Sequence, residues 1–136
     1  MHMEKEFVGD RRSEYRHSIC MDARVITPKT SFWAVATNIS GSGLEIQCPA
    51  TVNPKTKLMI ALQLQEEFVF HCTVIWTLGD FIDGRWVYRV GVKTEIIAFK
   101  NTSAASKKEK AELVQKILPQ IKAKGSNIGL AGSASA

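Results

Sequence analysis

The feature that most constrains the fold of this chain is the recurrence of apolar side chains at every second position. In the middle of the chain they stand at Leu58, Ile60, Leu62 and Leu64, and then at Phe68, Phe70, Cys72, Val74 and Trp76. Because successive side chains of a strand point to opposite faces, this period predicts two β-strands that each bury one face. The charged pair Glu66-Glu67 separates the two runs and marks the turn between them.

Four other segments favour strands and end at turn residues such as Pro, Gly and Asn. They are residues 23–27, 32–39, 43–48 and 86–92, and a loop is expected around Gly79 to Gly84. No helical pattern separates the six segments, whereas a parallel sheet would need crossover helices. The sequence therefore predicts an all-β dominated domain, built as an antiparallel barrel or sandwich.

The period changes to that of a helix after Phe99. Ser106 and Glu109 form an S-x-x-E capping box, a typical helix start. Apolar residues then follow at helical spacing, at Val114, Ile117, Leu118 and Ile121. Pro119 is expected to end or kink this helix near Leu118. Residues 123–136 are rich in Gly, Ser and Ala and are expected to form a disordered tail.

The length of 136 residues fits one domain, and the position of its charges argues against a general nucleic-acid binder. The net charge is +5, yet residues 1–99 carry 11 Lys and Arg against 11 Asp and Glu. Residues 100–136 carry 7 Lys against 2 Glu, so the excess lies in the C-terminal part. A DNA- or RNA-binding domain would be expected to carry a basic face on its body. No stretch is apolar enough to span a bilayer or to act as a secretory signal, so a cytoplasmic protein is expected.

Motifs of catalysis and metal binding are missing from the sequence. There is no GxxxxGK loop, no HExxH and no GxSxG elbow. The three cysteines and three histidines are scattered without ligand or triad spacing. We therefore expect neither an enzyme nor a metal site nor a cofactor.

Two polar segments could bind a ligand. The first holds Arg11, Arg12 and Arg16. A guanidinium can fork two hydrogen bonds onto a phosphate or onto the O6/N7 edge of guanine, and can stack on a base. The alternative interpretation of this segment is a solvated charged arm.

The second segment runs from Asn38 to Gly43 and reads NISGSG between two expected strands. Asn and Ser side chains can bond both the turn backbone and a ligand, and glycine permits positive φ or a close approach of the main chain. The alternative interpretation is an ordinary loop between strands.

Taken together, the two segments resemble the paired signature of the PilZ domain family. Its RxxxR motif corresponds to RSEYR, with Arg12 and Arg16, and its (D/N)xSxxG motif to NISGSG, with Asn38, Ser40 and Gly43. Asn38 follows Arg16 by 22 positions. The later segment VIWTLGDFIDGRWVYRVGVKT is also similar to the family's closing strands. The resemblance covers about residues 7–122.

The resemblance implies a six-stranded antiparallel β-barrel with a C-terminal α-helix, which binds the bacterial second messenger cyclic di-GMP. Arg12 and Arg16 would contact phosphate and guanine, Asn38 and Ser40 would bond a guanine edge, and Gly43 would hold the turn. Arg11 would stack on a base or bind a second, intercalated ligand molecule. Trp76 could form an apolar wall beside the base, although its place in the alternating stripe favours the core.

The domain division that follows is a flexible N-terminus (1–10), a PilZ-like barrel with its helix (11–122) and the tail (123–136). The expected mechanism is that cyclic di-GMP orders the arginine arm and creates a surface for a downstream protein, whose identity and process the sequence does not name.

Three alternatives remain. One is a PilZ-like protein-interaction module that does not bind nucleotide, and another is a barrel that stacks RNA or single-stranded DNA on Trp33, Trp76 or Trp86. The neutral body counts against the second. The third, a membrane role of the Lys-rich helix, is less favoured than packing of its apolar stripe on the barrel.

Overall fold

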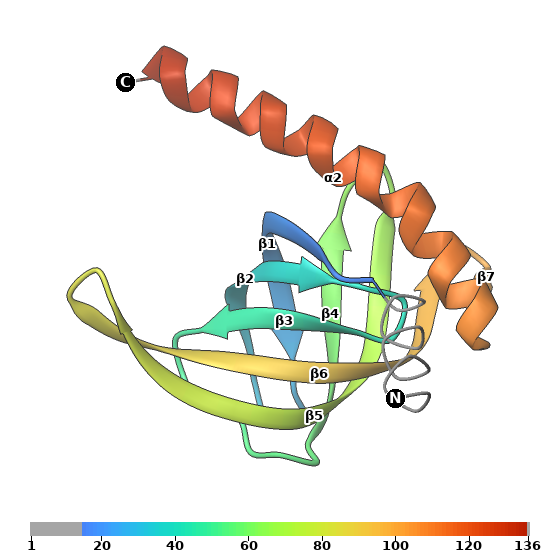
Figure 1. Ribbon diagram of the computed structural model, residues 1–136, viewed down its shortest axis with the longest axis horizontal. Helices are drawn as coiled ribbons and strands as arrows, with labels where there is room; N and C mark the ends of the chain where they lie inside the picture. Colours follow the sequence, from blue (N-terminus) through green and yellow to red (C-terminus); the bar gives the residue numbers. More distant parts are fainter. Residues whose placement is uncertain (1–14, 136) are drawn as a thin grey trace, which may run out of the picture.

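The computed structural model describes residues 15–135 and consists of one antiparallel sheet with a long C-terminal helix (Figure 1). The sheet order is β3-β2-β1-β4-β5-β6-β7, and an additional pairing of β3 with β6 closes the first six strands into a ring. The expected six-stranded barrel is thereby confirmed, and β7 is an extra short strand on the edge of β6. The strands are β1 (His17–Ile26), β2 (Ser31–Ile39), β3 (Gly43–Cys48), β4 (Lys57–Gln63), β5 (Glu67–Ile82), β6 (Arg85–Phe99) and β7 (Thr102–Ala104).

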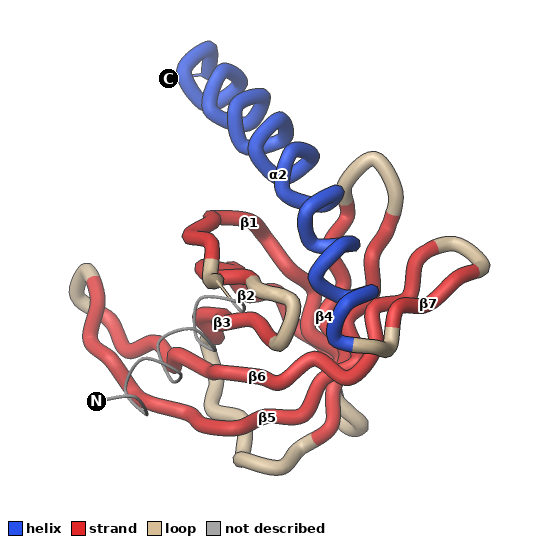
Figure 2. The backbone as a smooth tube through the Cα atoms, turned by 45° about the vertical axis from the view of Figure 1, so that its right-hand side comes forward, coloured by secondary structure: helices blue, strands red, loops and turns tan. Residues whose placement is uncertain are grey.

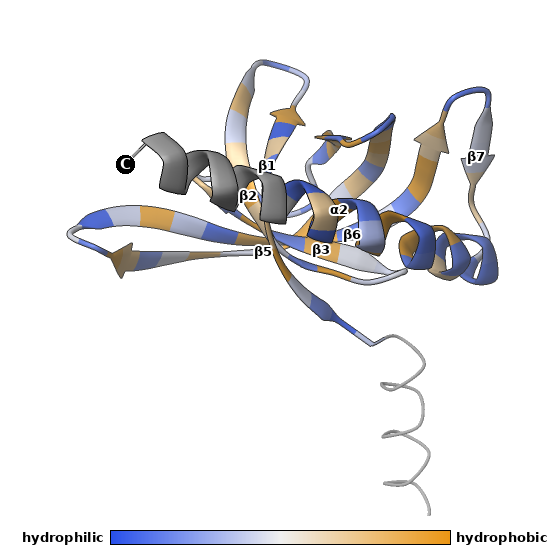
Figure 3. Cartoon of the chain, turned by 90° about the horizontal axis from the view of Figure 1, so that it is seen from above, coloured by the Kyte–Doolittle hydropathy of each residue, from blue (hydrophilic) through white to orange (hydrophobic). Residues whose placement is uncertain are grey.

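The alternating apolar residues of the strands fill the barrel. Phe68 and Phe70 of β5 and Ile60 of β4 are almost wholly buried, as the period of two predicts. Figure 3 shows the alternation of hydrophobic and hydrophilic residues along the strands. One contiguous core results.

β5 and β6 extend beyond the barrel as a long two-stranded arm (Figure 1). The expected loop from Gly79 to Gly84 is therefore wrong, because pairing continues to Ile82↔Arg85. The turn consists of Asp83 and Gly84, both with positive φ, at 50° and 82°. An Asp-Gly pair is the strongest short hairpin signal, since positive φ at both positions matches the twist of the strands. Phe81 and Trp86 face each other near the tip and are 59% and 62% exposed.

The helix α2 (Lys107–Ser135) begins at the expected capping box. The Glu109 N–H donates to Ser106 Oγ at 3.0 Å, and the Ser106 N–H donates to Glu109 Oε1 at 3.1 Å. Val114 and Ile117 are buried against the barrel, so the predicted packing of the apolar stripe is confirmed.

α2 crosses one end of the barrel and then projects past it (Figures 1 and 2). It does not end at Pro119, so of the two expected outcomes, an end or a kink near Leu118, the first is wrong. A proline within a helix removes one hydrogen bond, but each further residue adds one again once the helix has formed. The backbone of residues 123–135 is likewise helical, which differs from the disordered tail expected there. No helix in the described part of the chain is both long and apolar enough to cross a membrane.

Candidate ligand-binding site

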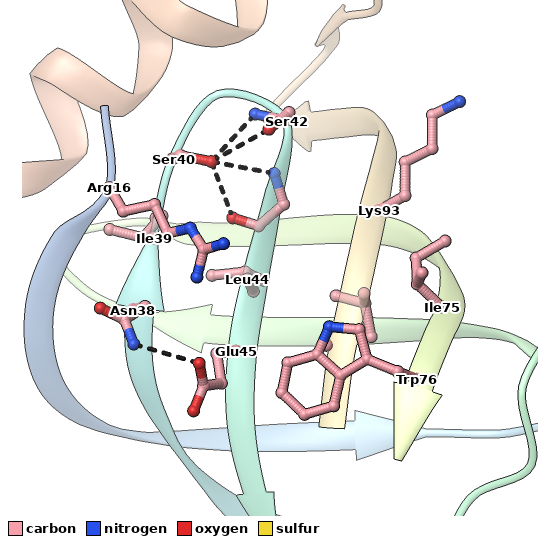
Figure 4. Close-up of a pocket in the computed structure, with 13 residues that line it drawn as sticks. Arg16, Asn38, Ile39, Ser40, Ser42, Leu44, Glu45, Ile75, Trp76 and Lys93 are labelled. Carbon is pink, nitrogen blue, oxygen red and sulfur yellow. Dashed lines mark hydrogen bonds between the residues drawn. The ribbon is translucent and has the colours of Figure 1, made fainter. Parts of the chain in front are cut away.

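A cavity of about 410 Å³ lies on the outer face of the barrel, where the chain entering β1 passes the ends of β2 and β3 (Figure 4). Its walls come from both sequence segments singled out above, from β3 and from the neighbouring strands β5 and β6. The residues that line it are Arg16, Asn38, Ile39, Ser40, Ser42, Gly43, Leu44, Glu45, Ile75, Trp76, Gly91, Val92 and Lys93.

Strand pairing places four of these residues in one row across the sheet. Asn38 of β2 is opposite Glu45 of β3, Glu45 is opposite Gly91 of β6, and Gly91 is opposite Trp76 of β5. Neighbouring strands are about 4.8 Å apart, so the row spans roughly 14 Å. The row forms the floor of the cavity.

Asn38 reaches this outer face because of a β-bulge. Ala34 and Ala36 of β2 are buried, so strict alternation would turn Asn38 into the core as well. The register of β2 against β3 shifts between Ala36 and Asn38, which inserts Thr37 as an extra residue. An extra residue reverses which face the following side chains occupy. Asn38 is consequently half-buried at the cavity rather than in the core.

Trp76 reaches the same face by a second bulge. Val74 is buried, yet the register of β5 against β6 shifts between Val74 and Trp76, and Ile75 becomes the extra residue. Trp76 is 37% exposed and lines the cavity, so its expected place in the core is wrong. A Cβ atom at Gly91 would overlap the indole ring, which shows that the ring lies directly on the glycine backbone.

The Ser40–Gly43 turn is held by its own side chains. Ser40 is buried, and its Oγ accepts the N–H groups of Ser42 and Gly43, each at 3.3 Å. The Ser40 N–H donates to the Gly43 carbonyl at 2.9 Å. Ser40 thus stabilises the loop in a compact turn, and a bond from it to a ligand remains a prediction.

Gly43 is needed for close approach rather than for positive φ. Gly84 is the only glycine with positive φ among the described residues. A Cβ atom at Gly43 would instead overlap the carbonyl oxygen of Val92 on β6. The glycine therefore allows β3 to pair with β6 at the point where the barrel closes, beside the cavity.

The cavity carries excess positive charge. Figure 4 shows the Arg16 guanidinium among the lining side chains and Lys93 on the opposite side, with its ammonium extended away from them, and neither forms an ion pair within the described residues. The carboxylate Glu45, in contrast, pairs with Arg89 at 3.0 Å. Two cations without an ion pair in the described part attract an anion, and Arg16 can bind a phosphate through two parallel hydrogen bonds.

The structure thus brings together Arg16, Asn38, Ser40, Gly43 and Trp76, five of the residues that the sequence singled out. Arg11 and Arg12 lie outside the described residues. Sequence analysis missed Lys93 and Glu45, although both stand two positions from a glycine of the site (Gly91 and Gly43), on the same face of its strand. No group of His, Cys, Asp and Glu that could hold a metal ion occurs in the described part.

The site therefore combines a flat aromatic wall, an amide, the backbone of a tight turn and two cations. Such a set suits a planar, hydrogen-bonding and anionic ligand, because the ring can stack on a π-system and the cations can bind its charge.

Two solved structures have a similar fold. The chain is similar in structure to the inhibitor of motility MotI/DgrA of Bacillus subtilis, with a TM-score of 0.58 and 14% identity over 81% of this chain and 53% of the other. It is also similar to MrkH in the K. pneumonia MrkH-c-di-GMP complex, with a TM-score of 0.58 and 13% identity over 84% of this chain and 55% of the other. The chain thus spans about half the length of each, and at these identities the likeness concerns the fold.

The sequence itself gives a further comparison. A search of the curated proteins finds no match. The model of the PilZ domain, however, matches residues 10–115, which include both polar segments and the whole barrel. The chain therefore belongs to the PilZ domain family.

Proposed function

We propose that this protein is a bacterial, cytoplasmic and non-enzymatic receptor for cyclic di-GMP. The observation that carries the proposal is the convergence of Arg16, Asn38 and Trp76 on one cavity that is lined by two basic residues, Arg16 and Lys93. Membership of the PilZ family and the fold shared with MrkH, whose solved complex contains c-di-GMP, support it.

In this proposal each wall of the cavity binds one part of the ligand. Arg16 and Lys93 bind phosphate oxygens, Trp76 provides a flat surface for a guanine, and the Asn38 carbonyl accepts guanine N–H groups. Ser40 and Gly43 keep the turn in the shape that the ligand meets. Phosphate contacts alone would give a similar affinity for any dinucleotide. Stacking of a base on the indole increases the affinity beyond that.

Arg11 and Arg12 complete the site in the proposal. Arg12 precedes Arg16 by four residues, so an extended chain can place it at most about 14 Å away, within reach of the same cavity. We propose that a dianionic ligand fixes this arm across the barrel and so creates a surface for a downstream protein. Hydrogen exchange measured with and without ligand tests this, with protection of residues 9–16 expected only in the complex.

A calorimetric titration of cyclic di-GMP, with GTP as the control ligand, tests the function itself. We expect binding of cyclic di-GMP and none, or far weaker binding, of GTP. Arg16→Ala should abolish binding and leave the thermal melt of the free protein nearly unchanged, because Arg16 is exposed and has no ion pair in the described part. Arg24→Ala is the control, because it removes the same charge from β1 at a residue outside the cavity.

The second candidate is a PilZ-type interaction module that binds no nucleotide. The exposed pair Phe81 and Trp86 at the tip of the β5–β6 arm favours it, since exposed aromatic groups commonly mark protein contacts. Absence of any heat of binding for wild-type protein, over concentrations up to the millimolar range, would support this candidate against the receptor.

A further inference from the structure

Glu45 occupies an unusual place for a carboxylate, in the centre of the cavity floor. It stands between Asn38 and Gly91 in the row of paired residues, and it is only 9% exposed. A carboxylate near the proposed anion would repel it, so its presence requires a reason other than direct contact with phosphate.

Both oxygens of Glu45 are engaged by neighbours. Asn38 Nδ2 donates to Oε1 at 3.3 Å, and Arg89 Nε donates to Oε2 at 3.0 Å. The Arg89 guanidinium in turn lies over the Trp76 ring, 5.9 Å from its centroid. Glu45 and Arg89 thus join the amide at one end of the row to the aromatic wall at the other.

The chemistry of the carboxylate decides how Asn38 is oriented. An ionised carboxylate only accepts hydrogen bonds, so the amide must turn its NH₂ group toward Glu45. Its carbonyl oxygen then points away from Glu45, as Figure 4 shows. An asparagine without such a neighbour can present either end of its amide to a ligand.

We propose that Glu45 is a positioning residue that fixes the amide of Asn38 with its carbonyl turned away from Glu45, as the end of the amide left to accept from the ligand, and that it thereby makes Asn, rather than Asp, the residue required at position 38. This inference rests on the proposed function, in which the carbonyl accepts the N–H groups of a guanine. The Arg89 guanidinium balances the charge of Glu45, so that the floor of the cavity does not repel the phosphates.

The arrangement predicts different effects for the two isosteric substitutions of this pair. In Glu45→Gln, the new amide accepts from Arg89 and turns its own NH₂ toward Asn38. Asn38 must then present its carbonyl to Gln and its NH₂ group to the ligand, which removes the guanine acceptor. In Asn38→Asp, two carboxylates face each other at hydrogen-bond distance, which disfavours the charged pair.

Combining the two substitutions restores a consistent set of donors and acceptors. The Gln at position 45 then accepts from Arg89 and donates to the Asp at position 38, whose other oxygen is left to accept from the guanine. The double variant is therefore expected to bind better than either single variant. A residue that merely supported the fold would not produce this rescue.

The test is calorimetric titration of cyclic di-GMP into the full chain, as wild type, the two single variants and the double variant. Loss of one hydrogen bond to a buried polar edge predicts about tenfold weaker binding or more for each single variant, and about threefold or less for the double variant. Glu95→Gln is the control, because Glu95 of the neighbouring strand β6 is an exposed carboxylate that accepts a hydrogen bond from Thr73 outside the cavity. Its affinity should equal that of wild type.

Thermal melts of the free proteins give a readout that does not depend on the ligand. Asn38→Asp should lower Tm, and adding Glu45→Gln should restore it. Wild-type affinity in Glu45→Gln, or a double variant as weak as the weaker single variant, would overturn the positioning role while leaving the receptor function intact. If wild type binds no cyclic di-GMP, the proposed function fails and the melts alone decide the orientation. Rescue of Tm then supports it, and unchanged Tm in Asn38→Asp overturns it.

Discussion

Gly91 of β6 and Trp76 of β5 are paired across the sheet, and the indole of Trp76 lies where a Cβ atom of residue 91 would stand. The glycine is what allows a large ring to lie flat on the outside of the barrel. Lys93 and Arg89, two positions away on either side of Gly91, share its face. The aromatic wall thus lies between two cations.

Gly91→Ala should displace the indole. Rearrangement around an added methyl group in a packed place costs on the order of 1–3 kcal/mol, so we expect a lower free energy of unfolding, measured by urea denaturation, and weaker cyclic di-GMP binding. Gly79→Ala is the control, because on the same hairpin an added Cβ would find only ordinary contacts, the nearest at 3.5 Å to the Trp86 ring. Equal stability and affinity of the two variants would contradict the packing described.

Gly43→Ala should be more damaging than Gly91→Ala. The new Cβ would meet the backbone carbonyl of Val92, which cannot move without loss of the β3–β6 pairing that closes the barrel. We expect destabilisation of about 3 kcal/mol or more, the upper end of what overpacking costs. Urea unfolding measures it, and hydrogen exchange should locate the loss in β3 and β6. A variant as stable as wild type would show that the strands can separate locally at no cost.

Glu109→Gln should change how stability depends on pH. Hydrogen bonds from the backbone N–H groups of Ser106 and Ala105 lower the pKa of the Glu109 carboxyl. A lowered folded-state pKa means that the charged form stabilises the fold above the ordinary pKa of Glu and that this contribution is lost as pH falls through the lowered value. Gln keeps the capping hydrogen bond but not the charge. Wild type should therefore have a slightly higher Tm than Glu109→Gln at pH 7, and the two Tm values should converge in acid. A difference in Tm that persists in acid would show that the charge of Glu109 is not its cause.

The three cysteines should differ in reactivity. Burial raises the pKa of the Cys48 and Cys72 thiols to about 12, whereas Cys20 is exposed. Because the thiolate is the nucleophile, a thiol reagent at pH 8 should modify one group quickly in the native protein and all three after unfolding. Cys20→Ser should remove the fast phase. A fast phase that survives this substitution would show that the barrel opens on the time scale of the reaction.

The barrel was predictable because most of its strands follow strict alternation. The residues of β4 that alternate in the sequence, such as Leu58, Ile60 and Leu62, are the ones that are buried. The capping box of α2 was also predictable, since Ser106 and Glu109 interact locally. Short-range patterns of this kind are set by backbone geometry and need no knowledge of distant contacts.

The orientation of the site residues was not predictable in the same way. Asn38 and Trp76 each follow a bulge, and a bulge reverses the face without leaving a sequence signal of its own. Glu45 and Arg89 are 44 positions apart in the sequence, and they meet only because of the register in which β3 pairs with β6. The length of the arm was missed because Asp83-Gly84 was included in a longer loop.

The Ser40–Gly43 turn faces the cavity on one side and α2 on the other. A Cβ atom at Gly41 would stand 3.0 Å from the Cα atom of Ala111, and Thr94 links the two elements by donating to the Ser42 carbonyl at 2.8 Å and accepting from Lys110 Nζ at 2.8 Å. Any rearrangement of this turn on ligand binding consequently changes the contacts between the turn and α2. Thermodynamic linkage makes such an effect reciprocal. If ligand binding changes the affinity of α2 for a partner molecule by some factor, binding of that partner to α2 changes the affinity for the ligand by the same factor.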